Sequence, residues 1–281
     1  RQTRLELGVN SNWYTYTAKD YPRYGLMGVT SSGYLVDFIT TGYSKAERVS
    51  KEELGLRGFN TTQIFAALVG DNTTFGSVAP LKGYRYRLEV GKYFGTTDYN
   101  LVLTDLRKYQ YVKPFTLAGR FYYEGRLNPR NLESLNRIYP LYLGYPWYIH
   151  GLDKNMFIGS WNQVGESSLS GEQMTVANLE VRLPFTGHKK LALIPFNYVA
   201  SDLNLFFDTG MTWSTRSPPP PEGVTPAVSR LTRNNAVMSL GVSLRMNLLG
   251  YLIIEPYLAY PYRDKQWQGQ ITGVNFMIAG W

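Results

Sequence analysis

The segment Ala236-Val-Met-Ser-Leu-Gly-Val-Ser-Leu-Arg-Met-Asn-Leu248 contains the most regular pattern of the chain. From Met238 onward, every second residue is large and apolar, and small or polar residues lie between them. Alternation with a period of two predicts a β-strand that has one apolar and one polar face. The central residues of the predicted apolar face are Leu240, Val242, Leu244 and Met246, and those of the polar face are Ser243, Arg245 and Asn247.

The same kind of pattern extends outward from this segment in both directions. It is found at residues 5–16, 84–94, 99–109, 115–127, 174–185, 202–213, 251–262 and 268–281. Residues 54–69 are a strand with poorer alternation, and residues 24–43 are expected to form a hairpin broken at Ser31-Ser32-Gly33. The expected loops are residues 44–53, 72–83 and 217–233. With no helical periodicity, the sequence predicts an all-β chain of about eleven antiparallel strands.

The predicted strands are long for a soluble sheet. They contain about 10–13 residues, whereas soluble strands usually have about 5–6 and membrane-spanning strands about 9–11. Their polar faces carry charge in mid-strand, as at Glu180 and Arg182, opposite uninterrupted aliphatic faces. The aromatic residues near strand ends, which are typical of interfacial girdles, are Trp13, Tyr109, Trp213, Tyr251, Tyr260 and Trp281. These features favour a transmembrane antiparallel β-barrel over the alternative, a soluble β-sandwich.

The composition limits the classes of function. The chain has 281 residues and no cysteine, which excludes disulfides and thiolate metal sites. Its net charge is +8, but the basic residues are scattered instead of clustered, so nucleic acid is not an expected partner. His150 and His188 are the only histidines, and neither a Gly-x-Ser-x-Gly elbow nor a phosphate loop occurs. We expect neither enzymatic activity nor a bound cofactor or metal.

Residues 139–152, Tyr-Pro-Leu-Tyr-Leu-Gly-Tyr-Pro-Trp-Tyr-Ile-His-Gly-Leu, depart from the strand pattern. They are rich in aromatic residues, contain two prolines and two glycines, and have no regular period. This composition predicts an ordered, conformationally restricted loop. Strands are predicted on both sides, so we expect one long loop that serves the barrel.

Three segments give the chain a resemblance to the bacterial surface-antigen barrels related to the outer-membrane assembly factor BamA. Tyr145-Pro-Trp-Tyr-Ile-His-Gly-Leu152 resembles that family's loop motif, in which an apolar residue precedes Arg-Gly and an aromatic residue. Phe206-Phe-Asp-Thr-Gly210 matches its Phe-x-Asp-x-Gly strand motif, and Asn178-Leu-Glu-Val-Arg-Leu-Pro-Phe185 matches the strand between them. The chain also ends on an aromatic residue. The site residues that the resemblance implies are Ile149, His150, Gly151 and Leu152 in the loop, and Phe206, Asp208 and Gly210 in the strand.

Three further motifs look closer to one subgroup, whose barrel follows a periplasmic TolB-like propeller. They are Asp71-Asn-Thr-Thr-Phe-Gly76, Gly83-Tyr-Arg-Tyr-Arg87 and Asp105-Leu-Arg-Lys-Tyr109. The resemblance covers residues 71–281 well and residues 1–70 weakly. Leu56-Arg-Gly-Phe59 also fits the loop pattern, but about five strands follow the loop in the family, which agrees with a loop ending at Leu152.

The resemblance implies a location and a role. Residues 1–281 would form an outer-membrane β-barrel domain, supplying roughly the last eleven of about sixteen strands. Roughly five strands and a periplasmic domain are then expected to precede Arg1. The location would be the bacterial outer membrane, in contact with its lipid and lipopolysaccharide. The role would be to assist insertion, assembly or export of outer-membrane or surface proteins, or to anchor a periplasmic module.

The mechanism that the family implies is a weak seam between the first and last strands. Residues 268–281 would be the last strand, and its unpaired edge would template an incoming strand. Possible partners are client outer-membrane proteins and periplasmic or lipoprotein partners. The alternative is a passive pore, or a structural barrel plugged by residues 139–152. A membrane-embedded lipid hydrolase is disfavoured because the sequence offers no catalytic set.

His150 is a departure from the family, which has arginine at this place, paired inside the barrel with the strand aspartate, here Asp208. A neutral histidine does not make the same bidentate, permanently charged contact. A weaker, pH-dependent lock is one reading, and we favour instead a loop held by its aromatic residues and prolines. Arg182 carries a permanent charge, so we expect it to be the main partner of Asp208. On this view His150→Ala is milder than Arg182→Ala.

The polar faces are expected to meet inside the barrel as a charged network. Paired acid/base catalysis is the disfavoured alternative, because charges that face a barrel interior pair with one another and with water. The carboxylates expected there are Glu89, Glu124, Glu180, Asp208 and Glu255, and the arginines are Arg85, Arg87, Arg120, Arg126, Arg182 and Arg245. Its principal members, besides Asp208, are Glu180, Arg182, Arg120, Glu124 and Arg245.

Overall fold

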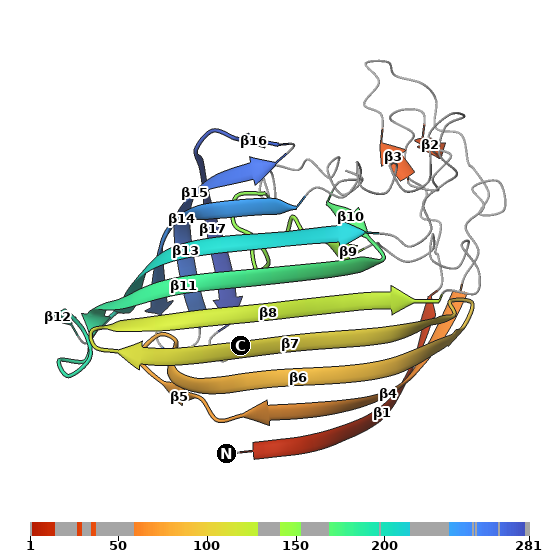
Figure 1. Ribbon diagram of the computed structural model, residues 1–281, viewed down its shortest axis with the longest axis horizontal. Coiled ribbons are helices and arrows are strands. Elements are labelled where there is room, and N and C mark those ends of the chain that lie inside the picture. Colours follow the sequence, from red (N-terminus) through yellow and green to blue (C-terminus); the bar gives the residue numbers. More distant parts are fainter. Residues whose placement is uncertain are drawn as a thin grey trace, which may run out of the picture.

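Every regular element in the described part of the chain is a β-strand (Figure 1). The computed structural model describes residues 2–14, 27–29, 35–37, 59–128, 141–152, 169–196, 198–213, 236–248, 250, 252–263 and 265–278. The long strands are β1 (Gln2–Tyr14), β4 (Phe59–Asp71), β6 (Pro80–Gly95), β7 (Tyr99–Val112), β8 (Phe115–Leu127), β11 (Gln173–Gly187), β13 (Ala200–Trp213), β14 (Val237–Leu248), β15 (Leu252–Arg263) and β17 (Ile271–Ile278). The short strands are β2 (Met27–Val29), β3 (Leu35–Asp37), β5 (Thr74–Phe75), β9 (Leu141–Tyr142), β10 (Ser170–Gly171), β12 (Ile194–Pro195) and β16 (Gln266–Trp267).

The long strands form one antiparallel sheet in which each pairs with the next long strand along the chain. The sheet curls, so that β15 and β17 cross the view steeply relative to β6, β7 and β8 (Figure 1). At one end of the sheet the strand ends are joined by residues 72–79, 113–114, 188–199 and 249–251, and at the other end by residues 15–58, 96–98, 128–172, 214–236 and 264–270. Every connection longer than twelve residues therefore joins strands at the second end, and the first is called the short-turn end. Within the described residues β1 pairs only with β4 and β17 only with β15, so the sheet is open.

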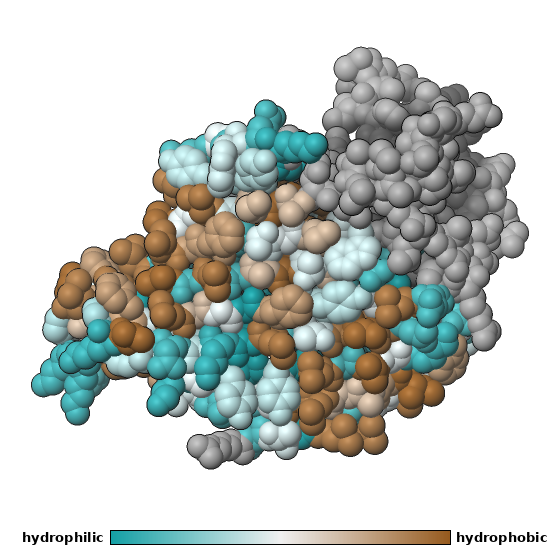
Figure 2. Space-filling view, in the orientation of Figure 1, coloured by the Kyte–Doolittle hydropathy of each residue, from teal (hydrophilic) through white to brown (hydrophobic). Residues whose placement is uncertain are grey.

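The two faces of the sheet reverse the usual distribution of apolar and charged side chains. Large apolar residues are exposed on the outward face, where they cover much of the surface in Figure 2. Those on the central strands include Leu88, Leu117, Phe121, Leu179, Val181, Leu203, Leu205, Phe207, Leu240 and Val242. The charged and polar residues buried on the inward face include Glu89, Arg182, Asp202, Asn204, Asp208, Ser243, Arg245 and Glu255. An apolar face of this extent indicates contact with something other than water.

The alternation in the sequence predicted these faces correctly. In β11, β13 and β14 the predicted apolar residues point outward and the predicted polar residues point inward. Five long strands follow Leu152 in the described residues, as expected. Residues 44–53, 217–233 and 56–58 lie outside the described residues, as do Tyr251 and Trp281.

Part of the hairpin expected within residues 24–43 is present, because β2 and β3 pair antiparallel with each other; in the described residues neither strand pairs with the main sheet. Two expectations need correction. Residues 72–83 are not only a loop, because they contain β5 and the first residues of β6. Tyr109 is not a girdle residue: odd-numbered positions of β7 face inward, and Tyr109 is buried with the Arg182 guanidinium 5.4 Å from its ring centre. In the described residues no helix is long and apolar enough to span a membrane.

Candidate functional site

In the described part of the aromatic loop, residues 143–152 fold as a compact turn that follows β9 (Leu141–Tyr142). The carbonyl oxygen of Tyr145 accepts hydrogen bonds from the backbone N–H groups of Tyr148 (2.9 Å) and Ile149 (3.2 Å). Tyr145 and Trp147 stack with their ring centres 4.4 Å apart. These contacts confirm the prediction of an ordered loop for residues 141–152; Tyr139 and Pro140 lie outside the described residues.

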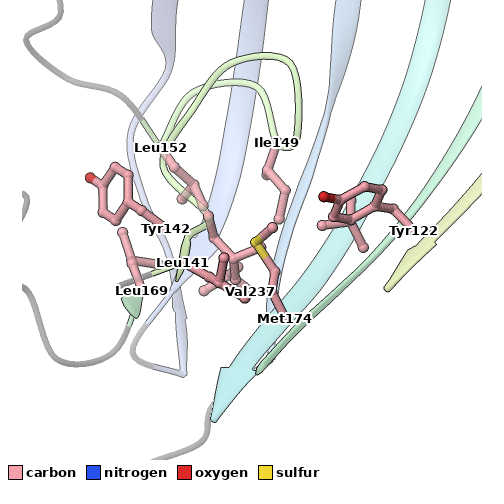
Figure 3. Packing of buried hydrophobic residues seen from close by; sticks show 10 residues of the cluster. Tyr122, Leu141, Tyr142, Ile149, Leu152, Leu169, Met174 and Val237 are labelled. Atoms are coloured by element: carbon pink, nitrogen blue, oxygen red, sulfur yellow. The ribbon is translucent and has the colours of Figure 1, made fainter. Parts of the chain in front are cut away.

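Apolar side chains anchor this loop to the inward face of the sheet (Figure 3). Leu143 and Ile149 are fully buried there. The sheet residues that receive the loop come from β8, β11 and β14, and they are Tyr122, Met174, Val176 and Val237. The inward face is thus apolar under the loop, and burial of two large aliphatic side chains contributes about 1.5–3 kcal/mol each to holding it.

A single carboxylate, that of Asp208 on β13, receives the end of the loop. The backbone N–H of His150 donates to Asp208 Oδ2 (3.1 Å), and the His150 ring donates its Nδ1–H to the same oxygen (2.7 Å). The other oxygen, Oδ1, accepts from Asn178 Nδ2 at 2.8 Å, and that amide also donates to the carbonyl of Tyr148 (2.7 Å). Asp208 is 1% exposed and His150 7% exposed, so these charge-assisted bonds are shielded from water.

The neighbours of Asp208 explain its strand motif. Phe206 stacks on the His150 ring at 4.3 Å between ring centres. A side chain at Gly210 would lie 3.0 Å from atoms of Ile149 and Leu143, so glycine leaves the space that the loop occupies. Gly151 has a φ of +79°, and a Cβ there would lie 2.8 Å from Ala259 Cβ. Six of the predicted residues, Ile149, His150, Gly151, Phe206, Asp208 and Gly210, therefore meet in one site, and Leu152 is buried in the apolar cluster beside it.

The environment of His150 favours its charged form. Burial alone lowers the pKa of a histidine, but the hydrogen bond to Asp208 and the charges of Asp208, Glu255 and Glu180 outweigh burial. The pKa of His150 is therefore raised above its ordinary value of 6.5. The Phe206 ring that stacks on the imidazole also favours its charged form.

Arg120 on β8 holds the opposite side of the loop. Its Nη1 donates to the carbonyl of Trp147 (3.1 Å), and its guanidinium lies 5.0 Å from the ring centre of Tyr122. Both its Nε and its Nη2 lie 3.1 Å from oxygens of Asp105, which also pairs with Arg107. Asp105 thus orients the arginine that binds the loop backbone.

A second charged cluster lies on β11, β14 and β15. Arg182 donates to Glu180 Oε2 at 2.6 Å, and Arg245 donates to Glu255 Oε1 at 2.8 Å. Arg245 also lies 3.5 Å from Glu180, which joins the two pairs. Ser243 donates to Glu255 Oε1 at 2.7 Å. Buried charges are stable here because each faces an opposite charge or a donor.

The expectation that Arg182 is the main partner of Asp208 was wrong. In the antiparallel register Asp208 stands opposite Asn178. Arg182 is four residues farther along β11 than Asn178, and it stands opposite Asn204. Arg182 therefore pairs with Glu180, and His150 takes the place beside Asp208.

The predicted charged network divides into separate groups. Arg120 belongs to a cluster with Asp105, and Glu124 accepts from the Tyr122 hydroxyl. On β6, Arg87 pairs with Glu89 and Glu6, and Arg85 pairs with Asp71. Only Glu180, Arg182, Arg245 and Glu255 form the cluster on β11, β14 and β15. Asn178, Asp105 and Asn204 are site residues that the sequence reading missed. Asn178 stood within a quoted motif and on the predicted inward face, which was the available signal.

The site attaches the loop to the sheet through the hydrogen bonds of His150 to Asp208 and the apolar packing of Leu143 and Ile149, and this attachment is called the lock. Among the described residues no group of three or more His, Cys, Asp or Glu side chains is placed to hold a metal ion.

Comparison of the sequence with protein-family models gives no match, and neither does comparison with curated proteins.

Proposed function

We propose that the chain is the barrel part of an outer-membrane protein of the BamA-like group, and that it assists insertion or assembly of other outer-membrane proteins. The observation that carries the proposal is the contact between His150 and Asp208. These residues lie in the two segments that resemble the family's loop and strand motifs, 58 residues apart in sequence. A chance resemblance of two short segments gives no reason for their meeting on the inward face of a sheet.

The distribution of side chains supports the membrane location. Lipid is a favourable environment for an outward face covered by Leu, Val and Phe, whereas water is not. The inward charges are paired, as charges in a barrel interior are.

The free edge of β17 supports a role in assembly. Within the described residues β17 pairs on one side only, with β15. Backbone donors and acceptors along an unpaired edge bind an additional strand readily. An incoming client strand would pair with this edge while its apolar side chains enter lipid.

The test uses photocrosslinking residues at exposed positions of the protein in vesicles, supplied with an unfolded outer-membrane client. Probes at Thr272 and Val274 on β17 report on the edge, and matched probes at Leu179 and Val242 report on central strands. We expect client crosslinks at the edge positions only, together with faster client folding than in empty vesicles.

The competing function has its own signature. Large, steady and solute-selective currents in a planar bilayer, without faster client folding, would show a passive pore. Absence of both currents and folding assistance would show a structural barrel closed by its loop.

A further inference from the structure

A shallow groove of about 420 Å³ crosses the outward face of β6, β7, β8 and β11. Tyr84, Lys108, Gly119 and Leu179 are direct neighbours in one row across these strands. Gly119 adds no side chain to the row and so leaves a gap between Lys108 and Leu179. Phe121, the next outward residue of β8, borders the gap on the side away from the β7–β8 turn.

Lys108 brings a positive charge to this apolar surface. Its Nζ lies 5.8 Å from the centre of the Tyr84 ring. The carboxylates of the same strands, Glu89 and Asp105, stand on the opposite face, where they pair with arginines. Among the described residues Lys108 forms no ion pair, and Lys82, also exposed on the outward face of β6, adds a second cation nearby.

The depth of Lys108 suits a lipid headgroup. It lies four residues before Val112, the end of β7, which is about 13 Å along a strand. A tilt of about 40° reduces the depth to about 10 Å from the short-turn end, and the lysine stem reaches farther toward the surface. Short turns of such barrels face the periplasm, so the adjoining lipid belongs to the periplasmic leaflet.

We propose that this groove binds an anionic glycerophospholipid, with its phosphate against Lys108 and an acyl chain over Gly119. The inference rests on the proposed membrane function. Charge complementarity selects the lipid: Lys108 stands at the headgroup level, with the apolar side chain of Leu179 in the same row and that of Phe121 farther from the short-turn end. The gap at Gly119 leaves room for an acyl chain, whereas side chains fill the corresponding positions of the neighbouring rows.

A second groove offers a comparison within the same molecule. It has a volume of about 540 Å³ and lies over β13, β14, β15 and β17. Its outward-facing lining includes Leu203, Val242, Thr272 and Val274, and it contains no charged residue. Acyl chains should enter it without a preference for headgroup charge.

The experiment uses the protein in phosphatidylcholine vesicles that contain a small fraction of a photoactivatable lipid with a diazirine in its acyl chain. The probe is either phosphatidylglycerol or phosphatidylcholine, and crosslinks are mapped by mass spectrometry. We expect about fivefold more crosslinks from phosphatidylglycerol at residues 106–121, and equal yields from both lipids at the second groove.

Two variants locate the site. Gly119→Leu fills the groove, and its Cβ would meet only Leu179 Cδ2 at 3.6 Å, so the backbone need not move. We expect it to lower the phosphatidylglycerol yield several-fold. Lys108→Gln should bring that yield down to the phosphatidylcholine level, and Thr272→Leu, which fills the second groove, should leave it unchanged.

The possible outcomes separate the two proposals. Equal yields from both lipids at residues 106–121, or yields that neither variant alters, would overturn the lipid site while crosslinks elsewhere on the outward face uphold the membrane location. Absence of crosslinks over the whole outward face would overturn both.

Discussion

At the scale of the residue, Asp208 joins three parts of the molecule. It accepts hydrogen bonds from the backbone and ring of His150 in the loop and from Asn178 on β11. A carboxylate that is 1% exposed and loses a donor retains the cost of its burial. His150 therefore does more than fill space, although its aromatic neighbours also hold it.

Replacing His150 should weaken the lock in proportion to the donors lost. His150→Ala removes the ring donor and the stacking on Phe206, and should lower the free energy of unfolding by about 1–3 kcal/mol. His150→Asn is the matched control because its side-chain amide places an N–H donor close to Nδ1. Urea unfolding of the two variants in lipid measures the difference. An alanine variant as stable as wild type would show that the aromatic packing alone holds the loop.

The lock should also weaken as pH rises. The pKa of His150 is raised in the folded protein, so its charge-dependent stabilisation is complete below about pH 6.5, the ordinary value, and is lost as pH rises through the folded pKa. The stability difference between wild type and His150→Asn should therefore shrink from about pH 5 to pH 9. A difference that stays constant would mean that the histidine does not titrate differently in the folded state.

At the scale of the element, the sequence predicted the faces of the strands but not their register. Side-chain parity follows from alternation alone, so the outward positions of β14 were predictable from Leu240 and Val242. The register depends on turns and on pairing between strands, and it decides that Asp208 meets Asn178. The preference for Arg182 over His150 rested on the permanent charge of arginine, and the register overrides it by placing Arg182 opposite Asn204.

The apolar patch beneath the loop could not be predicted for the same reason, because the sequence does not give the register of the strands. Val176 and Val237 occupy inward positions that otherwise carry polar residues, and the structure shows that they receive Ile149 and Leu143. An apolar residue at an inward position was the available signal. It specified neither the loop as its partner nor the strand that would lie beside it.

A lysine on the outward face of β14 distinguishes lipid from water. Val242 lies near the middle of β14 and is 45% exposed. In a membrane barrel Val242→Lys should cost about 2–4 kcal/mol near the midplane, whereas an exposed position of a soluble sheet usually changes by about 0.5 kcal/mol or less. Unfolding in lipid vesicles measures this cost, with Val242→Ile as the control. A cost below about 1 kcal/mol would argue against lipid contact at this position.

At the scale of the whole molecule, the protein combines an open, curled sheet with a loop held on its inward face. The described residues supply two unpaired edges, at β1 and β17, and an outward face that is apolar. Assembly of other proteins at the β17 edge requires that this sheet lie in a membrane. The lipid groove requires the same. The orientation of the sheet relative to lipid is therefore the central claim.

The most direct measurement of that claim is the accessibility of single labels along β14 in lipid vesicles. The chain contains no cysteine, so each introduced one is unique. Spin labels at Leu240, Val242 and Leu244 should be reached by oxygen dissolved in lipid and not by a water-soluble nickel chelate. Labels at the inward positions Ser239, Ser243 and Asn247 should be reached much less by oxygen, so that oxygen accessibility alternates with a period of two. Access of the chelate to the outward labels, or a helical period, would contradict the membrane orientation of the sheet.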